Sequence, residues 1–255
     1  MNPQYSTHSI QRIGLLLKRE WTLQHRSLLK ASLVLLLVLW GVRLLPLIFG
    51  KDYSEWAEGL RYDPLLISNT FASLGGLFIT YLVWLNKTVH KSQTEPYTLI
   101  PSSVGEKYAT FFIIALFYIV LALFIGLFSS TTLALLAPGC LENQFADWGR
   151  FFANISVNSG KIPRFWGGVF YIISYLLLSF STYMVSQIFF SKAITGILVA
   201  TLFLIIVPSM SPIIFTTSEV FSSETALLLF LLFNLFLSIL FLFLGYHILK
   251  RKQIK

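Results

Sequence analysis

Residues Thr94–Lys107, TEPYTLIPSSVGEK, form a polar stretch with two prolines between two long apolar runs. The stretch is too short to be a domain, so we interpret it as a loop that joins two helices. Outward from this loop the chain contains six apolar runs, each long enough to cross a hydrocarbon core of about 30 Å. The sequence therefore predicts an all-α polytopic membrane protein in which residues 1–255 form a single transmembrane domain.

The composition of the chain agrees with a membrane location. Of the 255 residues, 56% are hydrophobic and only 12% are charged, whereas an ordinary soluble domain carries about 25% charged residues. The first apolar run begins only near Ala31 and no small-x-small site follows it, so we expect no cleaved signal peptide. Cys140 is the only cysteine, which excludes an internal disulfide.

The six spans are expected at about residues 31–49, 65–85, 108–137, 165–190, 193–215 and 226–249. The loop at residues 86–107 then joins the second span to the third, and residues 191–192 make a tight turn after the fourth. Pro208 and Pro212 lie near the end of the fifth span, and proline removes a backbone donor and kinks a helix. Residues 208–221 are therefore expected to form a broken or re-entrant element.

Residues 9–27, ahead of the first span, predict an amphipathic helix. Four apolar side chains recur at the 3.6-residue spacing of one helical face: Ile10, Ile13, Leu17 and Trp21. Arg12, Arg19 and Arg26 fall on the opposite side. This pattern is typical of a helix that lies in the membrane interface with its basic face toward the lipid headgroups. An ordinary amphipathic helix that packs on another protein is the alternative.

Three further patterns concern the spans and their outer ends. Arg43 lies toward the far end of the first span and is expected to snorkel outward. In residues 50–63, three side chains share a helical face and predict a short interfacial helix in the aromatic belt: Tyr53, Trp56 and Leu60. In the second span, Gly75 and Gly76 predict the close approach of a neighbouring helix.

A stripe of hydroxyl-bearing side chains runs along one face of the fourth span. Its members are Tyr171, Tyr175, Ser179, Thr182 and Ser186. The stripe either lines a substrate path or forms hydrogen bonds across helices for a modest gain in stability. The sequence leaves both interpretations open.

The charged residues indicate how the chain is oriented. With six spans both termini lie on one side, and that side receives 13 of the 19 Lys and Arg residues. Eight of the 11 acidic residues fall on the opposite side. The positive-inside rule therefore places both termini and the loop at residues 86–107 in the cytosol.

Several kinds of chemistry have no residues to support them. No span carries Asp or Glu near its middle, which disfavours an ion-coupled carrier because such carriers use buried ionisable relays. The chain has no phosphate-binding Gly-x-x-x-x-Gly-Lys-Ser/Thr loop, no Gly-x-Ser-x-Gly elbow and no His-Glu-x-x-His. We expect the four scattered histidines to be interface residues and not metal ligands. The chain is therefore expected to be no enzyme and to bind no metal or cofactor itself.

The order of elements and the central loop together resemble a known family, the type-2 ATP-binding-cassette (ABC) transporter permeases of bacterial export systems. Many of these permeases carry Leu-Pro-x-Ser-x-x-Glu-Lys followed by an aromatic residue. The positions that fit this spacing are Pro101, Ser103, Glu106, Lys107 and Tyr108. Ile100 separates Leu99 from the proline, and Gly105 replaces the usual large apolar residue. The glycine argues against one continuous rigid helix through the segment.

This resemblance implies a division of labour between subunits. A separate cytosolic ATPase would use ATP and Mg²⁺, and its surface would take up the loop, called the coupling helix in this family. The corresponding residues here are Glu95, Pro96, Pro101, Ser103, Glu106 and Lys107. Residues 9–27 would match the family's connecting helix. A second permease copy, identical or a sister chain, would complete the transporter in the bacterial cytoplasmic (inner) membrane, and no nucleic acid is involved.

Three functions remain in competition. The leading hypothesis is the membrane-spanning permease subunit of an ATP-driven exporter, which requires an ATPase partner. The second is a non-transport polytopic membrane protein, such as an immunity factor, a sensor or an assembly scaffold, which would copurify with no ATPase. The third is an ion-coupled secondary carrier, whose transport would depend on ion gradients. The loop motif disfavours the second, and the missing carboxylates disfavour the third.

Overall fold

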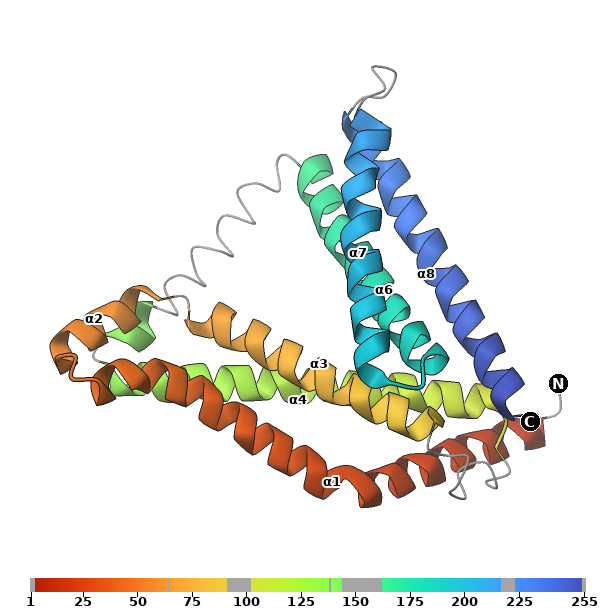
Figure 1. Cartoon of the computed structure of the whole chain (residues 1–255), viewed down its shortest axis with the longest axis horizontal. Coiled ribbons are helices and arrows are strands. Elements are labelled where there is room, and N and C mark those ends of the chain that lie inside the picture. The colour runs from red at the N-terminus through yellow and green to blue at the C-terminus, as the bar shows by residue number, and fades with distance from the viewer. Residues whose placement is uncertain are drawn as a thin grey trace. The chain divides into compact units, whose positions relative to one another are not determined.

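The computed structural model describes residues 3–63, 65–90, 102–137, 139–143, 162–216 and 223–253, and these ranges contain helices and no strands (Figure 1). The helices are α1 (Pro3–Ile48), α2 (Tyr53–Tyr62), α3 (Leu65–His90), α4 (Val104–Leu136), α6 (Ile162–Phe189), α7 (Ala193–Thr216) and α8 (Ser223–Gln253). The chain divides into two compact units. Unit 1 comprises Met1–Tyr81 and Ala109–Ser156, and unit 2 comprises Leu82–Tyr108 and Val157–Lys255.

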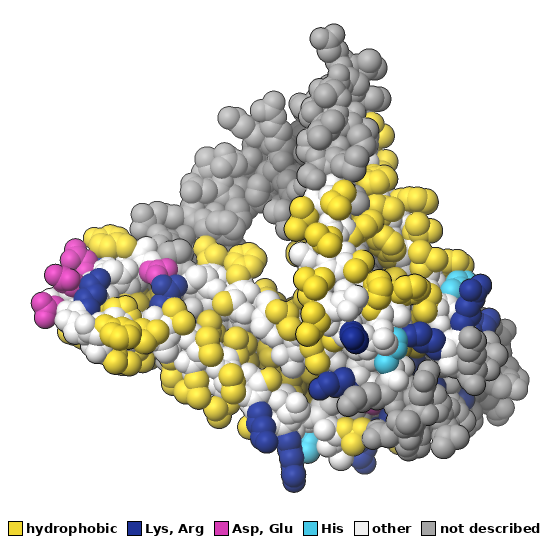
Figure 2. Space-filling view, in the orientation of Figure 1, with side chains coloured by type: hydrophobic (Ala, Val, Ile, Leu, Met, Phe, Trp, Pro, Cys, Tyr) yellow, Lys and Arg dark blue, Asp and Glu magenta, His cyan; other side chains and the backbone are white. Residues whose placement is uncertain are grey.

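Four helical segments within these ranges are long and apolar enough to cross a membrane: Ser9–Ile48, Leu65–His90, Val104–Leu136 and Leu228–Lys252. α6 and α7 contribute shorter apolar segments, Ile173–Phe189 and Ala193–Ile206. Large apolar side chains face outward along the helices, as the visible face in Figure 2 shows; Leu116, for example, is 66% exposed. Such extensive apolar exposure marks a surface that meets lipid or a partner. The multi-pass membrane class thus agrees with the structure, while the count of six spans stays a prediction.

The N-terminal region forms one helix where the sequence predicts two parts. α1 runs without a break over 46 residues, so the expected amphipathic helix at 9–27 and the expected span at 31–49 are continuous. Its buried side chains are Leu16, Glu20, Leu28 and Leu39. Of the predicted apolar stripe, Ile10 is 72% exposed, whereas Leu17 and Trp21 face α4. An interfacial position of this part of α1 stays a prediction.

Within unit 1, α3 and α4 approach closely at a glycine that the sequence analysis overlooked. A Cβ atom on Gly126 of α4 would lie 2.7 Å from the Cα of Thr70 on α3. Beside this contact, the Ser73 hydroxyl donates to the Ala122 carbonyl at 2.7 Å. Such small residues allow backbones to meet in a membrane protein. Of the predicted pair, Gly76 does receive a neighbouring helix, since a Cβ there would lie 2.9 Å from the Leu35 side chain of α1, whereas a Cβ on Gly75 would meet open space.

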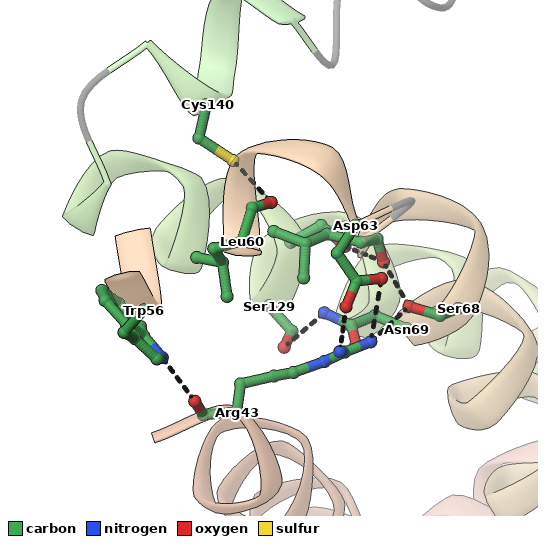
Figure 3. A network of polar contacts seen from close by, with 10 residues as sticks. Arg43, Trp56, Leu60, Asp63, Ser68, Asn69, Ser129 and Cys140 are labelled. Carbon is green, nitrogen blue, oxygen red and sulfur yellow. Dashed lines mark hydrogen bonds and ion pairs between the residues drawn. The ribbon is translucent and has the colours of Figure 1, made fainter. Parts of the chain in front are cut away.

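An ion pair joins the end of α1 to the chain just before α3 (Figure 3). The Arg43 guanidinium contacts the Asp63 carboxylate and donates to the Ser68 hydroxyl at 3.0 Å. The backbone carbonyl of Arg43 also accepts a hydrogen bond of 2.7 Å from the indole of Trp56 on α2. The Arg43 side chain therefore has a charged partner within unit 1, while its expected snorkelling stays a prediction.

The short helix predicted in residues 50–63 is present as α2, but its apolar face is buried. Trp56 and Leu60 are 4% and 5% exposed and form a cluster with Leu65, Leu133, Ala134, Ala137 and Cys140. The Cys140 thiol lies 3.4 Å from the Leu60 carbonyl. α2 thus packs within unit 1 through Trp56 and Leu60, and its expected place in the aromatic belt stays a prediction.

Candidate functional site

The central loop is the candidate functional site, and the structure describes both of its ends. Residues 91–101, which include the predicted coupling residues Glu95, Pro96 and Pro101, lie outside the described residues. Before them α3 ends at His90, and after them α4 begins at Val104. Both ends belong to unit 2. The contacts at these two ends decide what a force on the loop can move.

A capping box holds the start of α4. The Ser103 hydroxyl accepts a hydrogen bond of 3.2 Å from the backbone N–H of Glu106. In return, the Glu106 carboxylate accepts one of 2.9 Å from the backbone N–H of Ser103. Two donors that the first turn of a helix leaves unpaired are satisfied reciprocally in this way. α4 therefore starts at a defined residue, directly after the loop.

Glu106 and Lys107 are nearly inaccessible, at 6% and 3% exposed. Glu106 is engaged in the helix cap, so neither side chain presents its charge openly in this structure, and their role in the coupling loop stays a prediction. Gly105 does not interrupt α4, which continues through it. Residues 102 and 103 lie outside the helix, so α4 does not extend back through the described part of the loop, and the coupling role of the segment stays a prediction.

The first turn of α4 is tied to α8. The Tyr108 hydroxyl donates to the Leu242 carbonyl at 2.9 Å, and its ring lies edge-on to Tyr246 with centroids 6.0 Å apart. Gly245 makes room for this contact, since a Cβ there would lie 3.0 Å from the Tyr108 oxygen. A displacement of the loop end near Tyr108 therefore acts directly on α8.

The other end of the loop is tied to the end of α6. The Asn86 amide of α3 donates to the carbonyls of Gln187 and Phe190, at 3.1 and 2.7 Å. The Nε2 atom of His90 lies 3.2 Å from the Gln187 carbonyl. The last carbonyls of a helix have no partner within the helix, and here side chains from α3 supply it. α3 consequently holds α6 at its terminus.

α8 and α7 complete this arrangement, which we call the α6-end cluster: Asn86, His90, Gln187, Ile188, Phe190, Ala193 and Lys252. The Lys252 ammonium of α8 donates to the Ile188 carbonyl at 2.6 Å, where a cation also interacts favourably with the helix dipole. The Gln187 amide donates to the Ala193 carbonyl at 3.2 Å, which bridges the predicted tight turn between α6 and α7. The cluster therefore connects four helices at one point.

The predicted hydroxyl stripe on α6 is bonded mainly to its own helix. The side chain of Tyr171 lies outside the description. Ser179, Thr182 and Ser186 donate to the carbonyls of their own preceding turns, at 2.8, 2.7 and 2.7 Å, respectively. Thr182 and Ser186 are buried and Tyr175 is half-buried. These bonds satisfy the hydroxyls without a neighbouring helix, so a pathway role for the stripe stays a prediction.

The polar contact between α6 and α8 lies elsewhere. Asn234 is fully buried, and its amide is 3.5 Å from the hydroxyl of Ser174, which is also buried. Ser238 is fully buried and donates to the Asn234 carbonyl at 2.7 Å. The sequence analysis missed these residues and also Asn86 and Gln187. An amide side chain within an otherwise apolar run is the signal that finds them, because it needs a partner inside the membrane.

The predicted interfacial residues border a groove of about 340 Å³ between α1 and α4 in unit 1. Leu17 and Trp21 line it together with Ile113, Phe117 and other apolar residues of α4. Trp21 meets Phe117 edge-on, with ring centroids 5.5 Å apart. A chain of polar contacts runs along the groove.

In this series of polar contacts along the groove, the Tyr118 hydroxyl donates to the Gln24 side-chain oxygen at 3.3 Å, and the Gln24 amide donates to the Glu20 carboxylate at 2.8 Å. Arg19 pairs with the same carboxylate at 3.3 Å. Ile13 is half-buried, whereas Arg12 is exposed. Arg19 thus has a partner on its own helix, which the face assignment from the sequence did not anticipate.

The polar contacts around the loop join the ends of helices to one another. Their donors and acceptors pair with helix ends, and no group of three or more His, Cys, Asp or Glu side chains that could hold a metal ion occurs in the described part of the chain. What the site can do is to transmit displacement from residues 91–101 to α6, α7 and α8. No protein-family model, no curated protein and no solved structure matches this chain.

Proposed function

We propose that this chain is the membrane-spanning permease subunit of an ATP-driven ABC exporter. One observation carries the proposal: both ends of the central loop are tied to the same set of helices. Asn86 and His90 on one side contact the end of α6, and Tyr108 on the other side contacts α8. A partner that grips the loop between them would act on both contacts at once.

The mechanism follows from these contacts. A bound ATPase changes shape with its nucleotide, and it shifts the permease only if its contact with the loop differs between the two states. Movement of the loop would pull on the Gln187 and Phe190 carbonyls through Asn86, and on the Leu242 carbonyl through Tyr108. The capping box at Ser103 keeps the start of α4 intact under this load. α6, α7 and α8 would then tilt together against the rest of the transporter.

The subunit roles belong to the same proposal. ATP and Mg²⁺ are bound and used by the partner ATPase, since this chain carries no Gly-x-x-x-x-Gly-Lys-Ser/Thr loop. A second permease copy, identical or a sister chain, forms the other half. The excess of basic residues on the terminal side favours a cytoplasmic (inner) membrane location with both termini in the cytosol.

The test is a pull-down of the tagged full chain in mild detergent with identification of its partners. Glu106 is unsuitable for charge reversal because it caps α4, so Glu95→Lys within the loop is the informative variant. Glu58→Lys, at an exposed position of α2, is the matched control. We expect a nucleotide-binding protein to accompany the unmodified chain and the control, and to be lost from Glu95→Lys.

Two outcomes would contradict the proposal. One is that the unmodified chain elutes alone, or with unrelated proteins, in several mild detergents; this result favours the non-transport class. The other is that replacing the whole of residues 94–101 with a Gly/Ser sequence leaves a copurifying ATPase bound as before.

A further inference from the structure

The imidazole of His90 lies between a helix carbonyl and an ammonium group in the α6-end cluster. Its Nε2 atom is 3.2 Å from the Gln187 carbonyl oxygen. The Lys252 ammonium lies 3.2 Å from Nδ1 and 3.3 Å from Nε2. The same ammonium donates to the Ile188 carbonyl at 2.6 Å. His90 therefore joins α3 to α6 and α8 through a single ring.

These partners define the protonation state that the arrangement requires. A carbonyl oxygen only accepts hydrogen bonds and an ammonium group only donates them. With a proton on Nε2 the ring donates to the Gln187 carbonyl, and the Lys252 ammonium lies at nearly equal distances from both ring nitrogens. A neutral imidazole carries no charge against this ammonium, whereas the protonated ring places a second positive charge beside it.

We propose that His90 is a proton-operated latch: neutral His90 holds the ends of α3, α6 and α8 together, and protonation of His90 releases them. A second positive charge about 3 Å from the Lys252 ammonium is repelled. Lys252 must then move away from the ring, and its bond to the Ile188 carbonyl is disturbed with it. The proposal concerns the α6-end cluster alone and does not depend on an ATPase partner.

The surrounding charges offer little compensation for the added proton. Among the described residues, the other titratable groups near these ends of the adjoining elements are Lys87 of α3, Lys192 of the turn, Glu106, Lys107 and Tyr108 at the start of α4, and Tyr246, His247, Lys250 and Arg251 of α8. α6 carries none between Gln187 and Phe190. Glu106 is the only acid in this group, and its carboxylate accepts the Ser103 N–H in the helix cap. Protonation at His90 thus enters a region that is already basic.

Linkage gives the direction of the pH effect. The released form leaves His90 free to bind a proton, whereas the latched form excludes that proton. The form that binds more protons gains population as the pH falls. The latched form is therefore favoured at higher pH and is lost as the pH falls below about 6.5, the ordinary pKa of histidine.

The test measures the mobility of a spin label in the turn that the cluster holds. Cys140, the only cysteine, is replaced by Ala, and a label is attached to Cys introduced at exposed Ser191. The full chain is reconstituted in lipid nanodiscs, and its electron paramagnetic resonance spectrum is recorded at about pH 8 and about pH 5. We expect an immobilised spectrum at the higher pH and a larger mobile fraction at the lower pH.

Two variants at His90 make the result specific. His90→Gln retains a donor and an acceptor but does not titrate, so its label is expected to stay immobilised at both pH values. His90→Arg carries a permanent charge and is expected to be mobile at both. His247→Gln, at the exposed histidine of α8, is the matched control and should respond like the unmodified chain. A spectrum of the unmodified chain that is insensitive to pH, or a response of His90→Gln equal to that of the control, would overturn the latch.

Discussion

The polar contacts of unit 1 and those of unit 2 are built on different chemistry. In unit 1 the Arg43 guanidinium meets the Asp63 carboxylate (Figure 3), so opposite charges neutralise each other within the chain. In unit 2 the Lys252 ammonium meets the Ile188 carbonyl and the His90 ring, so a cation is held by neutral acceptors at a helix end. The first arrangement fixes its neighbours, whereas the second depends on the protonation and position of single side chains.

This difference teaches where movement is to be expected. Close backbone packing at Gly126 and the buried cluster around Trp56 add to the ion pair in unit 1. Unit 2 relies instead on hydrogen bonds from Asn86, Tyr108 and Lys252 to helix carbonyls. A single hydrogen bond contributes only about 1 kcal/mol when both groups are neutral, as for Asn86 and Tyr108, and about 1.5 to 3 kcal/mol when one is charged, as for Lys252, so such contacts can exchange one at a time. Unit 1 is accordingly the rigid part and unit 2 the adjustable part of this account.

The largest effect should come from breaking the backbone contact of unit 1. Gly126→Leu places a side chain where a Cβ already lies 2.7 Å from the Thr70 backbone. We expect α3 and α4 to separate at a cost of about 3 kcal/mol or more, measured as a lower midpoint of thermal unfolding in detergent. Gly75→Ala, which meets open space, is the matched control. Equal midpoints for the two variants would show that the close approach does not hold unit 1.

The ion pair of unit 1 should rank second. Asp63→Asn leaves the Arg43 guanidinium half-buried without its counter-charge. Removing one partner of a buried pair costs several kcal/mol and an exposed pair contributes little, so we expect a loss of about 2 kcal/mol here. Glu58→Gln, on exposed α2 surface, should leave the unfolding midpoint unchanged. An unaltered midpoint for Asp63→Asn would remove the argument that unit 1 is fixed by charge pairing.

The corresponding variant of unit 2 should lower the stability less than the unit 1 variants do. Its main expected effect is to weaken the proposed transmission of movement from the loop to α6. Asn86→Ala leaves the carbonyls of Gln187 and Phe190 short of one donor each, and we expect a loss of about 1 to 2 kcal/mol. The ATPase of the proposed complex should still copurify, since residues 91–101 are unchanged, while its ATP hydrolysis should no longer respond to this chain. Thr88→Ala, two residues further along α3 and therefore on a different face of the helix, serves as the control. Loss of ATPase binding in Asn86→Ala would instead mean that this residue belongs to the docking surface.

The smallest effect concerns the helix cap beside the loop. Ser103→Ala removes the acceptor for the Glu106 N–H and should cost about 1 kcal/mol, whereas Ser103→Thr should retain most of the stability. Ser102→Ala is the control next to it, because the buried Ser102 hydroxyl has no hydrogen-bond partner among the described residues. Amide hydrogen exchange of the first turn of α4 would report the difference. Identical exchange in the two alanine variants would contradict the capping assignment.

Much of the secondary structure was predictable because it depends on local patterns. The helical class, the tight turn at residues 191–192 and the long third span follow from apolar runs and their breaks. Ser103 and Glu106 also have the spacing of a capping box, a signal contained in the loop motif. α1 runs through residues 28–30 because no proline or glycine interrupts it there.

The partners of polar side chains were not predictable in this way. Asp63 follows Arg43 by 20 residues and lies beside it only because α2 packs within unit 1 and returns the chain to the end of α1. Asn86 and Gln187 are separated by 101 residues, and nothing in either local sequence specifies that they meet. The burial of Glu106 and Lys107 likewise arises from tertiary packing. A pattern of residue types indicates which side chains need partners, whereas the fold determines which partners they find.

The most direct test of the central claim combines the loop, the turn and the partner. The spin label at position 191 is recorded in the complex of the full chain with its copurified ATPase, with and without a non-hydrolysable ATP analogue. The account predicts that the nucleotide changes the mobility of the label in the unmodified chain and not in Asn86→Ala, although the ATPase remains bound to both. A spectrum of the unmodified complex that is unchanged by nucleotide would contradict the claim that the loop moves α6, α7 and α8.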